Sequence, residues 1–200
     1  MSTTIDPVVL QQLVAQAVRQ LQKEGNQPVV SDISDVPDEY GVFTTMSDAI
    51  NASESAQHML LFQSPSQRQK WVDVIRKTCL DKTNMQMMSR MAVEETEIGR
   101  YEDKVIKNTA AARYTPGIED LRTDARTGEH GLVLFEYSPF GVIGAITPTT
   151  NPTETIINNS IGMIAGGNTV VFSPHPRAKK TSVFLVQLLN KALYEARSEE

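Results

Sequence analysis

The chain has 200 residues, of which 40% are hydrophobic and 22% charged, a composition typical of globular proteins. Its formal net charge of -5 argues against a nucleic acid as partner. No apolar run approaches the roughly 20 residues of a membrane span, and the N-terminus lacks the pattern of a signal peptide. The single cysteine fits a reducing cytosol, and the scattered histidines offer no metal-ligand spacing, so we expect a cytoplasmic protein without a metal site.

Residues 1–22 predict an amphipathic helix. Asp6 can cap it, with Pro7 at the first helical position. Its apolar residues recur at three- and four-residue spacings along one stripe: Leu10, Leu13, Val14, Ala17, Val18 and Leu21. Residues 23–40 are rich in Gly, Pro, Ser and acids, which is typical of a flexible linker. The residues alone favour equally a helix that docks on its own protein and an address peptide for another protein.

Residues 41–200 form the body, which begins with helical patterns. Ser47 is expected to cap the first helix, and Ser64 the second, with Pro65 at its first position. Further helices are expected over 84–97 and 101–114. The methionines of the third helix are expected to fill the core: Met85, Met87, Met88 and Met91. Cys79 is interpreted as a small buried residue and not as a reactive thiol.

The second half of the body alternates between strand and helix patterns. Residues 131–146 predict two strands, interrupted at Ser138-Pro139, and 151–167 predict a helix opened by Asn151-Pro152. Residues 168–174 predict a buried strand, and 178–196 a second helix. This order is typical of parallel βαβ units, so the predicted class is α/β with a helical preface.

Polar loops follow two of these strands, at 147–151 and 173–176. Ligands of open parallel sheets bind beyond the carboxyl ends of the strands. Thr149, Thr150 and Asn151 also precede a helix N-terminus, where free amides favour anions or oxyanions. Thr150 or Asn151 could instead cap the helix, and both roles can hold together. Glycine-rich phosphate-binding motifs are absent, so the residues alone indicate an α/β ligand-binding segment.

Two segments carry a family resemblance. "EYSPFGVIGAITPTTNPTETIINNSIGMIAGGNTVVFSPHPRAKK" and, upstream, "EDKVIKNTAAARYTPGIEDL" resemble the coenzyme A-acylating aldehyde dehydrogenases of the aldehyde dehydrogenase superfamily. The similarity runs from about residue 40 to 196. Within the family, "FEYSPFGVIG" and "NPTETIINNS" are most similar to the propionaldehyde dehydrogenases of bacterial microcompartments. The resemblance implies the N-terminal portion of an aldehyde dehydrogenase-like, Rossmann-type NAD-binding domain.

The resemblance also implies site residues. In the superfamily an asparagine of the first loop donates to the substrate oxyanion; its position falls here on Thr150, with Asn151 adjacent. A lysine and a glutamate that hold the cofactor ribose are replaced here by Ser173 and Pro176. The resemblance therefore places Ser173, Pro174 and His175 in a nucleotide pocket, together with Thr147, Pro148, Thr149, Thr150 and Asn151. His175 is as well explained by packing between two prolines.

The reaction implied by the resemblance converts a short aldehyde, coenzyme A and NAD+ into acyl-coenzyme A and NADH. A cysteine performs this reaction, and in the family it lies beyond the second βαβ unit, so this chain alone is expected to be inactive. The family also implies that residues 1–22 direct a homo-oligomeric enzyme into the lumen of a microcompartment by binding a shell protein. The alternatives are acetaldehyde as the substrate, and a non-catalytic product that acts as a shell-targeting or binding module.

Overall fold

The computed structural model describes residues 40–198. The sequence-predicted helix within residues 1–22 and nearly all of the linker at 23–40 therefore lie outside the described residues. The described elements, in chain order, are the helices α2 (Met46–Leu60), α3 (Pro65–Leu80), α4 (Lys82–Thr96) and α5 (Tyr101–Tyr114), the short η1 (Ile118–Asp120), the strands β1 (Asp124–Gly128), β2 (Gly131–Phe135) and β3 (Val142–Thr147), then α6 (Pro152–Ala165), β4 (Thr169–Pro174), η2 (Pro176–Ala178) and α7 (Lys179–Ser198).

Side-chain caps decide where the first helices begin. Ser64 caps α3 as predicted, because its hydroxyl accepts a hydrogen bond from the Gln67 N–H at 3.1 Å. The predicted cap at Ser47 is wrong. Thr45 has the extended backbone of a cap and accepts from the Asp48 N–H at 3.2 Å, which places Ser47 inside the first turn of α2.

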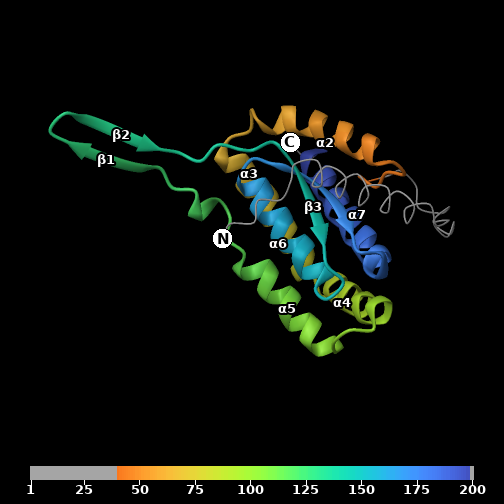
Figure 1. The fold of residues 1–200 in the computed structure, drawn as a ribbon. Coiled ribbons are helices and arrows are strands. Elements are labelled where there is room, and N and C mark those ends of the chain that lie inside the picture. The colour runs from red at the N-terminus through yellow and green to blue at the C-terminus, as the bar shows by residue number, and fades with distance from the viewer. Residues whose placement is uncertain (1–39, 199–200) are drawn as a thin grey trace, which may run out of the picture. The chain divides into compact units, whose positions relative to one another are not determined.

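The predicted parallel βαβ unit is confirmed. β3 pairs with β4 in parallel, from Val142 opposite Thr169 to Thr147 opposite Pro174, and α6 forms the crossover. α6 contacts both strands, and so does α2 (Figure 1). Side chains alternate along β3: Ala145 and Thr147 are buried, whereas Ile146 between them is 88% exposed.

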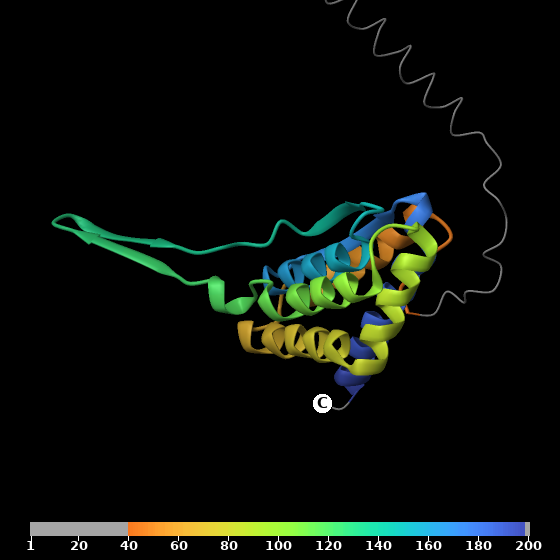
Figure 2. The same cartoon turned by 90° about the horizontal axis from the view of Figure 1, so that it is seen from below.

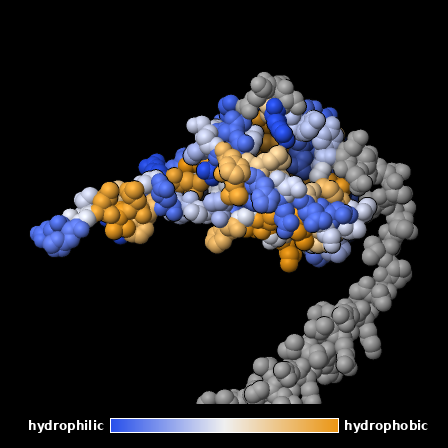
Figure 3. All heavy atoms as spheres, turned by 90° about the horizontal axis from the view of Figure 1, so that it is seen from above, coloured by the Kyte–Doolittle hydropathy of each residue, from blue (hydrophilic) through white to orange (hydrophobic). Residues whose placement is uncertain are grey.

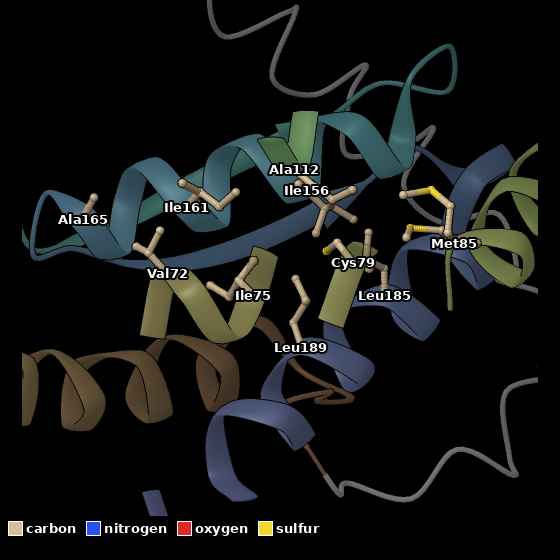
Figure 4. Close-up of a cluster of buried hydrophobic side chains, with 12 residues drawn as sticks. Val72, Ile75, Cys79, Met85, Ala112, Ile156, Ile161, Ala165, Leu185 and Leu189 are labelled. Carbon is tan, nitrogen blue, oxygen red and sulfur yellow. The ribbon is translucent and has the colours of Figure 1, made fainter. Parts of the chain in front are cut away.

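Helix α3 lies at the centre of the core. Val72, Ile75 and Cys79 of this helix are fully buried. They belong to one cluster with apolar residues of four other helices, which Figure 4 draws as sticks: Met85, Met88, Ala112, Ile156, Ile157, Ile161, Ala165, Leu185 and Leu189. Met85 and Met88 therefore fill the core as predicted. Met87 does not, because it lies on another face of α4 and is 48% exposed.

Polar side chains connect α2 and α4 to the later part of the chain, at the start of β4 and at the start of α7. Gln57 of α2 donates to the Gly167 carbonyl at 2.9 Å and accepts from the Thr169 N–H at 2.7 Å, where β4 begins. Glu95 of α4 accepts from the first-turn amides of α7, those of Lys180 and Thr181, at 2.7 Å each. This carboxylate satisfies amides that have no partner inside their own helix, and its charge suits a helix N-terminus.

Strand β1 was not predicted from the sequence. β2 pairs with β1 as an antiparallel hairpin, from Asp124 opposite Phe135 to Gly128 opposite Gly131. The segment "DARTG" lacks an apolar alternation, so only its pairing with β2 makes it a strand. The hairpin projects from the helices in both views of the ribbon (Figures 1 and 2).

The hairpin carries exposed apolar side chains on both of its faces. Four successive residues of β2 are at least half exposed: Leu132, Val133, Leu134 and Phe135. Figure 3 shows apolar surface gathered on the projecting arm. Such a surface is unusual on a lone chain and is typical of a protein contact. Among residues 40–198, no helix is both long and apolar enough to cross a membrane.

Candidate functional site at the strand ends

The two predicted loops lie side by side. The His175 N–H donates to the Thr147 carbonyl at 3.1 Å, directly after the last paired residues of β3 and β4. The expectation that adjacent parallel strands bring these loops together is confirmed.

The first loop holds two buried hydroxyls without partners. The Thr147 side chain is 1% exposed, and neither its Oγ1 nor that of Thr149 hydrogen-bonds to any of the described residues. A buried hydroxyl that lacks a partner destabilises a protein by about 1–3 kcal/mol. Each oxygen exposes less than 1 Å² of surface, so a ligand atom reaches it only if the loop moves.

Neither Thr150 nor Asn151 caps helix α6 with its side chain. Asn151 occupies the cap position but makes no side-chain cap hydrogen bond. Its Oδ1 accepts instead from Lys107 Nζ at 3.3 Å, and its backbone carbonyl accepts from the Thr155 N–H at 3.1 Å. The capping alternative for these two side chains is therefore wrong.

A buried lysine supports this loop, and the sequence analysis did not identify it. Lys104 of α5 is 2% exposed, and its Nζ donates to the Thr150 carbonyl at 2.6 Å and to Glu154 Oε1 at 3.4 Å. Its position on the helix could have revealed it. Lys104, Asn108 and Ala112 are the buried residues of α5, at a spacing of four, so Lys104 continues an inward-facing stripe.

The second loop borders an apolar hollow. Ser173 and Pro174 line a space of about 1330 Å³ between α2, β4 and α7, which Val170, Phe172 and Lys179 also line. An apolar slot with a nearby cation suits the base and phosphates of a nucleotide. None of the first-loop residues from 147 to 151 lines this space.

The His175 side chain is exposed, and one of its two ring nitrogens makes a local hydrogen bond. Its Nδ1 accepts from the Arg177 N–H at 3.1 Å, at the start of η2. One ring nitrogen thus has a local structural role, as the acceptor for the first turn of η2. The other, Nε2, has no partner among the described residues and is free to donate outward.

Cys79 is buried inside α3, as the sequence analysis expected. It lies in the apolar cluster, and its removal from water raises the pKa of its thiol from 9.0 to about 12. A thiol needs its thiolate form to attack a carbonyl, so Cys79 is not the nucleophile of a reaction at neutral pH.

The fold and these loops define a class of protein. A parallel βαβ unit with polar loops beyond both strand ends is the arrangement of nucleotide-binding α/β domains. Residues 38–197 match the model of the aldehyde dehydrogenase family. The chain belongs to this family.

Relatives within the family act on aldehydes and coenzyme A. The chain is 45% identical to an acetylating acetaldehyde dehydrogenase of Bilophila wadsworthia, over 79% of this chain and 32% of that one. It is 58% identical, with a TM-score of 0.77, to the structure of a Rhodopseudomonas palustris propionaldehyde dehydrogenase with bound propionyl-CoA, covering 78% of this chain and 35% of that one.

A second similar structure is that of a microcompartment enzyme. This propionaldehyde dehydrogenase from the fucose utilisation microcompartment of Clostridium phytofermentans is 52% identical, with a TM-score of 0.75, covering 79% of this chain and 36% of that one. The chain thus spans about a third of the length of the proteins it matches and corresponds to their N-terminal part.

The burial of Cys79 predicts an inert thiol. With a pKa of about 12, roughly one thiol in 10⁴ is ionised at pH 8. Labelling by a disulfide reagent at pH 8 should therefore be slower than for a free cysteine by at least about 100-fold, and should become fast in denaturant. Rapid labelling of the folded chain would contradict the burial. Cys79→Ala serves as the blank.

Proposed function

We propose that this chain is the N-terminal part of a coenzyme A-acylating aldehyde dehydrogenase that oxidises a short aldehyde, with propionaldehyde favoured over acetaldehyde. The observation that supports this best is the pair of adjoining loops beyond β3 and β4 in a chain of this family. Propionaldehyde is favoured because two similar solved structures are propionaldehyde dehydrogenases, at 58% and 52% identity. The alternative, a non-catalytic binding module, requires only the nucleotide pocket and the N-terminal helix.

The second loop is proposed to hold the cofactor, NAD+, which accepts a hydride from the substrate when bound. Ser173 and Pro174 line the apolar hollow, and Lys179 lies at its border. His175 is exposed beside them, with Nε2 available for a ribose or phosphate oxygen. The same pocket would take the nucleotide part of coenzyme A after the reduced cofactor leaves.

The first loop is proposed to stabilise the oxyanion that forms when a cysteine attacks the aldehyde. Asn151 is the better of the two candidate donors, because its Oδ1 is engaged by Lys107 and its Nδ2 group has no partner among the described residues. An amide held in this way presents N–H donors outward. The nucleophilic cysteine itself is proposed to lie outside this chain, since Cys79 is buried in the core.

Joining residues 40–197 to the remainder of the Rhodopseudomonas palustris enzyme tests the reaction. With propionaldehyde, coenzyme A and NAD+, the hybrid should form NADH. Asn151→Ala should lower kcat by about 100-fold with little change in KM, because one oxyanion donor is lost. His175→Ala should instead raise the KM for NAD+ and leave kcat nearly unchanged.

The controls of this experiment separate the candidates. The 200-residue chain alone should show no turnover. A parallel series with NADP+ in place of NAD+ shows which of the two cofactors the hybrid prefers. A hybrid that folds but does not turn over any short aldehyde would refute the proposed function. An unchanged kcat in Asn151→Ala, with a loss in Thr150→Ala, would assign the donor to Thr150.

Residues 1–22 are proposed to bind a microcompartment shell protein and so place the enzyme in the lumen. The support is the apolar stripe in the sequence and the similarity to an enzyme of such a compartment. A helix this short is marginal in water when isolated, so we expect it to fold on an apolar groove of its partner.

Shell binding predicts a clear effect of charge on the stripe. Residues 1–24 fused to a fluorescent protein should co-localise with shells. Leu10→Glu combined with Leu13→Glu should abolish this, because burying each leucine stabilises the complex by roughly 1.5–3 kcal/mol and carboxylates oppose burial. Gln12→Glu combined with Gln16→Glu adds the same charge on the opposite face and is the matched control. A diffuse wild-type fusion would refute shell binding.

The full-length enzyme is proposed to be a homo-oligomer that covers the hairpin. The apolar residues from Leu132 to Phe135 are half exposed, and a second copy offers a matching surface. Light scattering of the hybrid enzyme should give a multiple of the subunit mass. Val133→Lys combined with Leu134→Lys should shift it toward the monomer, whereas an unchanged mass would place the subunit contact elsewhere.

A further inference from the structure

We infer that Lys104 and Lys107 are positioning residues, which hold the loop from Thr147 to Asn151 in the shape that the oxyanion donor requires. The inference rests on the proposed function, because the donor is Asn151. Both lysines lie on one helix, α5, and they contact successive residues of the loop: Lys104 the Thr150 carbonyl at 2.6 Å, and Lys107 the Asn151 side chain at 3.3 Å.

The burial of Lys104 argues for a specific role. Lysine is among the residues least often buried, because removing its ammonium group from water is costly unless it is paired. Here the side chain is 2% exposed, and its partner Glu154 is 11% exposed. The Thr150 carbonyl receives the shorter of the two hydrogen bonds. The charge is thus aimed at the backbone of the loop as well as at the carboxylate.

Glu154 makes this arrangement compatible with helix α6. A lone cation beside the first turn of a helix is unfavourable, because the N-terminal end of the helix dipole is itself positive. Glu154 lies in that first turn and pairs with Lys104 at 3.4 Å, while its other oxygen accepts from the Thr153 hydroxyl at 3.1 Å. The Glu154 carboxylate therefore interacts favourably with both the Lys104 ammonium group and the N-terminal end of α6, and it holds the ammonium group beside the loop.

Lys107 acts on the orientation of the Asn151 amide. An ammonium group can only donate, so it selects the amide orientation that places Oδ1 toward α5. Nδ2 is then the end that is free for an oxyanion. If the amide turned over, a carbonyl oxygen would face the developing negative charge and repel it. The two lysines together hold both the backbone and the side chain of the donor.

A purely structural role for Lys104, as a link between α5 and α6, makes a different prediction. Its loss would then weaken the whole fold and would not affect the loop selectively. Two amides report on the loop: Thr155 N–H bonds to the Asn151 carbonyl, and His175 N–H bonds to the Thr147 carbonyl. Amides of the α3 core around Ile75 report on global unfolding.

Hydrogen exchange of the 200-residue chain, followed by NMR, separates these roles. In Lys104→Met, which keeps most of the stem, the Thr155 and His175 amides should exchange at least about tenfold faster, while the α3 amides change by less than about twofold. Equal changes at all three places, or no change at the loop, would overturn the inference. Lys191→Met, on the exposed side of α7, is the control and should alter none of them.

The hybrid enzyme supplies the catalytic readout. Lys104→Met should lower kcat by about tenfold or more, and Lys107→Met by about threefold, with the KM for NAD+ within about twofold; complete loss of a donor costs about 100- to 1000-fold. A rise in KM without a fall in kcat would overturn the positioning role. If Lys104→Met does not fold, the test passes to Lys107→Met. The Lys107 side chain is exposed, so its replacement leaves the fold intact, and an unchanged kcat in this variant refutes the inference.

An inactive wild-type hybrid would refute the proposed function, and with it the link between the two lysines and an oxyanion donor. The exchange measurement on the chain itself then decides whether the lysines hold the loop. Faster exchange confined to Thr155 and His175 shows in that case that the lysines hold the loop, and unchanged exchange overturns this too.

Discussion

A sheet of two parallel strands cannot form a core by itself, and the rest of this structure depends on how the helices compensate. Parallel strands need apolar cover, and two strands offer little area for it. Helix α3 supplies the missing surface, because Val72, Ile75 and Cys79 are fully buried against residues of α4, α5, α6 and α7 (Figure 4). The crossover helix α6 is thereby fixed, and with it the loop that precedes it.

Polar contacts between distant segments then set the details around the strand ends. Gln57 of α2 satisfies the backbone at the start of β4, and Glu95 of α4 satisfies the first turn of α7. Lys104 of α5 does the same for the loop after β3. Gln57 and Lys104 join helices of the preface to the βαβ unit, and Glu95 joins one to α7; each satisfies backbone groups that would otherwise lack partners. The helical preface is thus part of the site's support.

Much of the fold could be predicted because local patterns decide it. Ser64-Pro65 marks the start of α3, and Asn151-Pro152 that of α6. The prediction failed where local sequence offers several solutions. Thr45, Ser47 and Asp48 are all plausible cap residues, and the backbone conformation at Thr45 decided among them. The polar strand β1 exists only through its pairing with β2.

The sequence by itself determined the class, the order of the helices and of the strands other than β1, and the two loops at the strand ends, since hydrophobic periodicity and proline placement are local properties. Only the tertiary structure decided which polar groups meet there. Lys104 and Thr150 are 46 residues apart in the sequence. From the sequence alone, a lysine on a helix is expected to be solvated, and only packing against another element shows that Lys104 is buried. The orientation of the Asn151 amide, set by Lys107, and the unpaired Thr147 hydroxyl likewise follow from packing between elements, which no local pattern encodes.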